Sequence, residues 1–89
     1  MTLNLETLFC SKARAKIIKI LAINGELNIS KIIKLTKLNH KIVITHLKYL
    51  IEEGIVQEKR YGKIRIFRFK EENIKAKYIK NLIKLIEGD

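Results

Sequence analysis

The chain has 89 residues, enough for one small domain with a modest core, and 47% of them are hydrophobic, which excludes a disordered basic tail. It carries 19 Lys and Arg against 9 Asp and Glu, a net charge of +10, which favours a polyanionic partner: nucleic acid, acidic lipid or an acidic protein. Cys10 is the only cysteine, which excludes an internal disulfide and a multi-cysteine metal site.

Residues 1–24 are expected to form an N-terminal segment and a first helix. Ser11 is a candidate N-cap, and apolar residues recur after it at helical spacing. Gly25 suits the left-handed position that ends a helix. A short apolar patch precedes the helix at Leu5, Leu8 and Phe9. The polar face of the helix is expected to hold Lys12, Arg14, Lys16 and Lys19.

Residues 26–29 are expected to be a short extended link, after which Ser30 caps a second helix that ends near Leu38. Asn39 is the next candidate cap, and the stretch that follows raises a conflict. Residues 42–45 are all β-branched, which favours a strand. At helical spacing, however, one arc is apolar and the opposite arc is polar, which predicts a helix over 39–53. The apolar arc contains Val43, Leu47, Leu50 and Ile51, and the polar arc contains Lys41, Thr45, Lys48 and Glu52.

Residues 55–60 and 63–69 are predicted to be two strands of a hairpin joined at Tyr61-Gly62. Phe67 and Phe69 share a face that should point inward, while Arg68 should point outward. A last helix is expected over 72–87. The apolar arc of this helix is wider than one packing contact needs, so the helix should contact both its own domain and a partner.

This order of elements predicts an α+β, mostly helical fold, the winged helix-turn-helix: a three-helix core, a β-hairpin wing and a C-terminal dimerisation helix. The single domain would span residues 1–89, with the helix-turn-helix at 30–53 and the wing at 55–70. The tight turn would fall at Leu38-Asn39. In such a fold the third helix enters a DNA major groove and the hairpin reaches adjacent DNA.

The placement of charge supports DNA binding more specifically than the total charge does. Residues 27–51 contain five lysines and no Asp or Glu. Lys31 and Lys41 fall in first turns, where the helix dipole disfavours cations. Fold stability alone would favour acids there, whereas a nearby phosphate chain explains lysines.

Three segments, SKARAKIIKIL, ELNISKIIKLTKLNHKIVITHLKYLIEEGIV and EKRYGKIRIFRF, resemble the ArsR-like winged-helix regulators. The form with LF-x-SKAR ahead and YG-x-IRI in the wing is similar to small archaeal members. The resemblance implies homodimers held by the first and last helices, and operator binding through residues 39–53. The chain departs from the family at Ile44, where these regulators usually carry Ser. Metal-sensing relatives use Cys pairs or a last-helix His, which this chain lacks, so no metal, cofactor or small-molecule effector is expected.

Ten residues are the candidates for DNA contact; for each the alternative is a solvated surface side chain. Tyr61 could stack in a minor groove or only complete the turn, and Ile44 could touch a thymine methyl. His46 is expected to be a packed histidine and not a ligand. The candidates are His40, Lys41, Ile44, Thr45, Lys48, Lys31, Arg60, Tyr61, Lys63 and Arg65.

The dimer interface is expected to use apolar residues of both ends of the chain. Cys10 could be a small apolar filler there, or could form a symmetric Cys10–Cys10 bridge between two copies. The candidates are Leu5, Leu8, Phe9, Cys10, Ile74, Tyr78, Leu82 and Leu85.

The sequence therefore predicts a homodimeric, sequence-specific DNA-binding transcriptional regulator in the cytoplasm. It shows no leader, no apolar run of membrane-spanning length and no catalytic constellation, so neither a membrane protein nor an enzyme is expected. Three rivals remain open. They are a non-specific architectural DNA-binding protein, a winged helix that binds an acidic protein in a transcription or replication assembly, and a membrane-surface role for the basic amphipathic residues 72–87.

Overall fold

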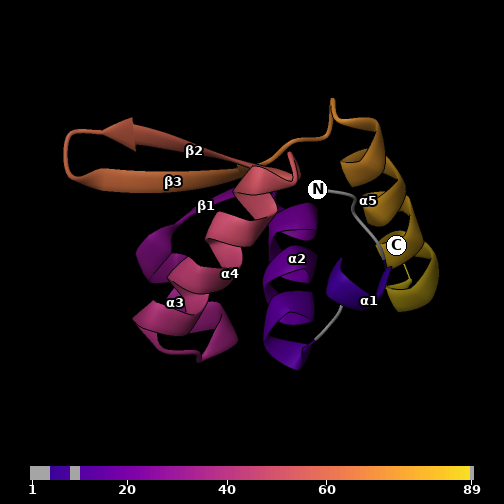
Figure 1. The fold of residues 1–89 in the computed structure, drawn as a ribbon, viewed down its shortest axis with the longest axis horizontal. Coiled ribbons are helices and arrows are strands. Elements are labelled where there is room, and N and C mark those ends of the chain that lie inside the picture. The colour runs from indigo at the N-terminus through magenta and orange to yellow at the C-terminus, as the bar shows by residue number, and fades with distance from the viewer. Residues whose placement is uncertain (1–4, 9–10, 89) are drawn as a thin grey trace.

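The computed structural model describes residues 5–8 and 11–88, together with the helices and strands that they form (Figure 1). The elements in chain order are α1 (Leu5–Leu8), α2 (Lys12–Asn24), β1 (Glu26–Asn28), α3 (Ile29–Thr36), α4 (His40–Glu52), β2 (Val56–Tyr61), β3 (Ile64–Phe69) and α5 (Ile74–Glu87). The β2–β3 hairpin, here called the wing, extends past the helices on one side, and α5 stands on the other. This order confirms the predicted winged helix-turn-helix.

Helix α2 begins and ends where its sequence signals predict. The Ser11 hydroxyl oxygen accepts a hydrogen bond from the Arg14 backbone N–H at 3.2 Å, which satisfies one of the free donors of the first turn. Gly25 ends the helix at a φ of +86°, a conformation that side chains with a Cβ rarely adopt. Its N–H donates to the Leu21 carbonyl at 2.8 Å.

The predicted extended link is a strand, β1, which pairs antiparallel with β3 in a sheet of order β1-β3-β2. Three residues are too few to show a strand pattern in the sequence, so only the pairing partner defines it. The predicted cap at Ser30 is wrong as well. Asn28 caps α3, because its backbone is already extended and its Oδ1 accepts from the Lys31 N–H at 2.8 Å.

The turn of the helix-turn-helix lies between Thr36 and Asn39. Lys37 adopts a left-handed conformation at a φ of 60°, and its N–H donates to the Ile33 carbonyl, which ends α3 two residues before the predicted end. Asn39 then caps α4 as predicted, since its Oδ1 accepts from the Ile42 N–H at 2.9 Å. The two caps fix the angle at which α4 leaves the turn.

The β-branched stretch of α4 is helical, as its periodicity predicts. Val43, Leu47 and Leu50 are each 1% exposed or less, and the predicted polar arc faces solvent. A β-branched residue costs a few tenths of a kcal/mol in a helix, whereas burial of one large apolar side chain stabilises by about 1.5–3 kcal/mol. Burial therefore decides the conformation.

The wing is joined by the two-residue turn Gly62-Lys63, one residue later than predicted, so Tyr61 and Ile64 are directly paired. Phe67 and Phe69 point into the core as predicted. On the opposite sheet face, Arg68 binds the Gln57 amide oxygen and the Glu72 carboxylate.

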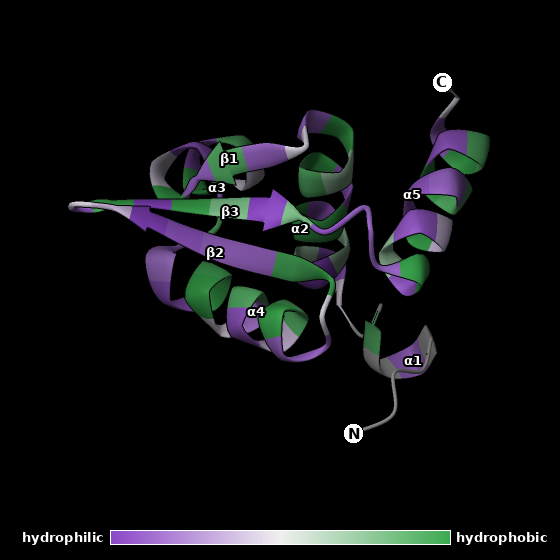
Figure 2. Cartoon of the chain, turned by 90° about the horizontal axis from the view of Figure 1, so that it is seen from above, coloured by the Kyte–Doolittle hydropathy of each residue, from purple (hydrophilic) through white to green (hydrophobic). Residues whose placement is uncertain are grey.

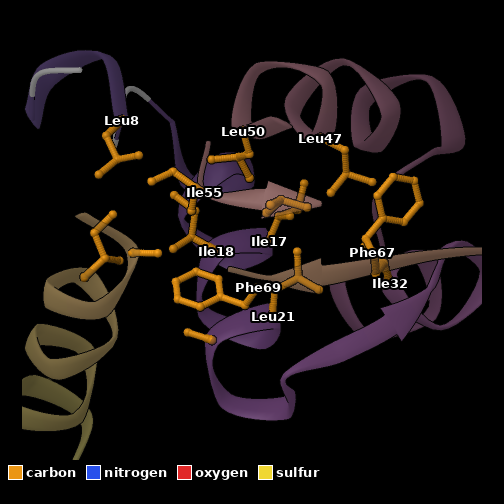
Figure 3. Close-up of a cluster of buried hydrophobic side chains, with 14 of the residues drawn as sticks. Leu8, Ile17, Ile18, Leu21, Ile32, Leu47, Leu50, Ile55, Phe67 and Phe69 are labelled. Carbon is orange, nitrogen blue, oxygen red and sulfur yellow. The ribbon is translucent and has the colours of Figure 1, made fainter. Parts of the chain in front are cut away.

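One hydrophobic core lies between the helices and the sheet (Figure 3). Helix α5 begins at Ile74, with the Asn73 side chain as its N-cap, and packs Ala76 and Ile79 inward. Leu8 of α1 is 2% exposed within the chain, so it belongs to this core, which corrects its assignment to the dimer surface. Arg14 is another correction: expected on the polar face of α2, it is only 8% exposed.

The register of α4 can be tested by two apolar truncations on the same helix. Leu47→Ala should lower the free energy of unfolding by about 2–5 kcal/mol, because it leaves a cavity in the core. Ile42→Ala, at a side chain that is 38% exposed, should change it by less than about 1 kcal/mol. Urea denaturation followed by circular dichroism measures both. Equal losses would mean that α4 faces the core differently.

Candidate nucleic-acid interface

The exposed side of α3, the turn and α4 carries five lysines, here called the lysine surface: Lys31, Lys34, Lys37, Lys41 and Lys48. All five are exposed, and His40 lies beside them at the start of α4. Among the residues that the structure describes, six ion pairs form, and none involves a lysine of this surface. Neither helix has an acidic residue in its first turn. The surface is therefore uncompensated positive charge, suited to a chain of phosphates.

The outward side of α4 offers few groups that read bases. The Thr45 hydroxyl donates to the Lys41 carbonyl at 2.9 Å, so the backbone uses its hydrogen. Ile44 is half-buried, and Ile42 is more exposed than Ile44. Ile42 was not among the predicted contacts, although at about 100° per residue it lies nearer to Thr45 than to the buried Val43 on the helix. This side presents apolar and cationic groups.

A buried arginine ties α4 to α2. The Arg14 Nε–H donates to the His46 Nδ1 at 3.2 Å, and the guanidinium lies 3.8 Å from the centre of the Tyr49 ring, a cation–π contact. His46 is thus the packed histidine that the sequence predicts. The pairing was not predictable, because its partners are 32 positions apart.

The structure separates the four wing candidates into two kinds. Lys63 is exposed in the turn, and Tyr61 is 60% exposed beside Ile64 at 56%, an apolar pair at the tip that the sequence did not predict. Arg65, by contrast, donates to Glu58 from Nε at 2.7 Å and from Nη2 at 3.3 Å. Arg60 donates to the same carboxylate at 3.4 Å. Arg65 is therefore held against the wing, whereas the Arg60 side chain is 65% exposed and makes a single contact to the same carboxylate.

The candidate dimer surface is the outer face of α5, defined by Ile74, Tyr78, Leu82 and Leu85. All four side chains are exposed, from 42% for Leu82 to 81% for Leu85. Figure 2 shows hydrophobic and hydrophilic residues mixed along α5, which stands apart from the wing. Of the remaining candidates, Phe9, Cys10 and the side chain of Leu5 lie outside the described residues.

Two negative findings apply to residues 5–8 and 11–88. No group of three or more His, Cys, Asp or Glu side chains is placed to hold a metal ion. No helix in this part of the chain has the length and apolar character needed to cross a membrane.

The burial of His46, with Arg14 beside it, makes stability depend on pH. Burial, and then the nearby Arg14 charge, lower the pKa of His46 below its usual 6.5. The folded state therefore favours neutral His46, while the unfolded state protonates it near pH 6.5. The stability that neutral His46 contributes is therefore fully present above about pH 6.5. It is lost as the pH falls from there through the lower pKa that His46 has in the folded state.

We expect the loss of unfolding free energy between about pH 7.5 and pH 5.5 to be smaller in His46→Gln than in the native chain. The matched control is His40→Gln, at an exposed histidine of the same helix, which should follow the native chain. Urea titrations across this range measure the difference. If His46→Gln lost as much stability as the native chain, the titration of His46 would not be the cause.

Comparisons with known proteins agree with this geometry. The family model described as "Bacterial regulatory protein, arsR family" matches residues 11–58. HlyU from Vibrio cholerae is 16% identical to this chain with a TM-score of 0.78, and the match covers 90% of this chain and 84% of the HlyU chain. The transcriptional repressor PagR of Bacillus anthracis is 26% identical with a TM-score of 0.70, covering 91% and 85%. Sso10a-2, a DNA-binding protein from Sulfolobus solfataricus, is 16% identical with a TM-score of 0.60, covering 86% and 82%.

A sequence search of curated proteins gave no match. The family and the fold are those of DNA-binding transcriptional regulators, not of enzymes. Because the family model matches more than half of the residues, this chain belongs to the arsR family of regulatory proteins.

Proposed function

We propose that the chain acts as a homodimeric, sequence-specific DNA-binding transcriptional regulator. The observation that carries the proposal is the lysine surface, whose five exposed cations have no ion-pair partner among the described residues. Membership of the arsR family supports the DNA-binding role. Each phosphate that such a surface neutralises releases counterions, so binding should weaken steeply as salt rises.

Helix α4 would enter the major groove, whose width of about 12 Å admits one helix. His40, Lys41, Thr45 and Lys48 lie on its exposed side, while Leu47 and Leu50 anchor the other side in the core. Lys31 of α3 would meet the flanking backbone. Lys63 and Tyr61 would reach adjacent DNA from the wing.

The outer face of α5 would form the dimer interface. Four large exposed side chains on one side of a helix are unusual in a monomer of this size. Two hollows flank α5 where it crosses α2, of about 330 Å³ beside Ile23 and about 160 Å³ beside Ile86, and both are lined by Ile83. Apolar side chains of a second copy could fill them. A two-fold dimer would place its two α4 helices about one DNA turn, ~34 Å, apart.

A second candidate function is non-specific, architectural DNA binding. It is favoured by the chemistry of α4, because lysines contact phosphates without reading sequence and the Thr45 hydroxyl hydrogen is already used by the backbone. Competition of one selected duplex against bulk DNA separates the two functions. A regulator should prefer its site by about a thousandfold or more, whereas an architectural protein should not.

Removal of two lysines from α4 should weaken DNA binding without unfolding the chain. At about 0.1 M salt, Lys41→Ala with Lys48→Ala should raise the dissociation constant roughly tenfold to a hundredfold. The slope of log affinity against log salt should become less steep by about 0.9 for each phosphate that the variant no longer neutralises. Fluorescence anisotropy with a labelled duplex measures both quantities.

The matched control is Lys16→Ala with Lys77→Ala, which removes the same charge from exposed positions of α2 and α5 that line neither hollow. It should change the dissociation constant by about twofold or less. Equal weakening by the two double variants would mean that total charge, and not the α4 surface, governs binding.

The dimer interface can be tested on the outer face of α5. Tyr78→Ser with Leu85→Ser should weaken self-association by about a hundredfold or more, because four large side chains per dimer would lose their burial. Helix content should remain, since both side chains are exposed in the single chain. Analytical ultracentrifugation compares this variant with Lys77→Ser, at an exposed position of α5 that lines neither hollow. A native chain that sediments as a monomer at micromolar concentration would refute the dimer.

A further inference from the structure

Two of the three arginines of the wing, Arg60 and Arg65, lie around one carboxylate. Glu58 lies on β2 and accepts from Arg65 through both of its oxygens, at 2.7 and 3.3 Å, and from Arg60 at 3.4 Å. The strand register places Arg60 directly opposite Arg65 and Glu58 opposite the buried Phe67, so all of these side chains share one face of the sheet. Like charges directly opposite each other destabilise a hairpin, and Glu58 offsets that repulsion.

This arrangement changes what the wing offers to a phosphate. The Nε–H and Nη2–H groups of Arg65 point to Glu58, and these are donors that a guanidinium uses for paired contact with an anion. The guanidinium also lies 5.4 Å from the centre of the Phe67 ring, which holds it against the sheet. The Arg65 and Arg60 hydrogen bonds and charges lower the pKa of Glu58, which keeps it ionised. The three groups together contribute one positive charge where two arginines alone would contribute two.

From this geometry we propose that Glu58 is a specificity-determining residue, which keeps Arg60 and Arg65 from attaching to DNA phosphates of any sequence. This inference rests on the proposed function. Non-specific affinity comes almost entirely from phosphate neutralisation, and what matters among competing genomic sites is the ratio of specific to non-specific binding. A carboxylate inside the wing lowers the non-specific part, while the lysine surface on α3 and α4 stays free to bind.

Other carboxylates in the described residues do not combine these features. Glu26 pairs with Lys59, and Glu71 with Lys80, each through one contact between an exposed carboxylate and a half-buried lysine. Glu72 holds Arg68 on the other face of the sheet, near the start of α5. Glu58 alone of this described set binds two cations of the wing.

The test is Glu58→Gln, measured by anisotropy on a duplex of random sequence. The freed arginines should tighten binding about three- to tenfold at roughly 0.1 M salt for each phosphate that they newly neutralise, and should steepen the salt slope by about 0.9 per phosphate. Glu71→Gln removes the same charge and also breaks an ion pair, but away from the wing, and should leave the slope unchanged.

A second variant separates released arginines from the simple removal of a negative charge. Glu58→Gln with Arg60→Gln and Arg65→Gln should return the slope to that of the native chain. Circular dichroism confirms that each variant is folded.

Weaker binding by Glu58→Gln would overturn the inference, and so would a salt slope equal to that of Glu71→Gln. In either case the lysine-dependent binding of the native chain would remain. Failure of the proposed function would look different, because the native chain itself would then bind no DNA.

Discussion

The arrangement of this chain depends on the burial of one side of α4. Val43, Leu47 and Leu50 are buried in the core, where Figure 3 shows Leu47 and Leu50. This burial holds four successive β-branched residues in a helix that they do not favour. With that side buried, the helical repeat places Lys41, Thr45 and Lys48 on the surface. The same contacts that stabilise the fold thus determine which groups of α4 are available to DNA.

The second constraint is where the chain places its acids. The described carboxylates that form ion pairs lie on β1, on β2, next to α5 and at its end, and there they hold Lys19, Lys59, Lys80 and three arginines. Helices α3 and α4 have acids only at the end of α4, so the positive charge is partly compensated around the wing and α5 but not on the lysine surface. A strongly basic protein binds polyanions through the cations that remain uncompensated. In this chain five of those cations lie together on the lysine surface of the helix-turn-helix.

Much of the fold could be predicted from sequence because it rests on local signals. The caps at Ser11 and Asn39, the stop at Gly25 and the periodicity of α4 each depend on residues within a few positions of one another. Contacts between distant segments could not be predicted from sequence. Strand β1 exists only through its pairing with β3, Arg14 turns inward because His46 and Tyr49 receive it, and Leu8 is buried by segments far along the chain.

The candidate site follows the same rule: exposure of Lys41 and Lys48 is a property of the helical repeat, whereas the capture of Arg60 and Arg65 by Glu58 depends on strand register. The central claim is that two copies read DNA through α4. Selection of duplexes from random sequence by the native chain tests it most directly. An enriched inverted repeat, with half-sites centred about one helical turn apart and bound about a thousandfold more tightly than unselected DNA, is the predicted result. Enrichment of no sequence, or of a lone half-site without symmetry, would contradict it.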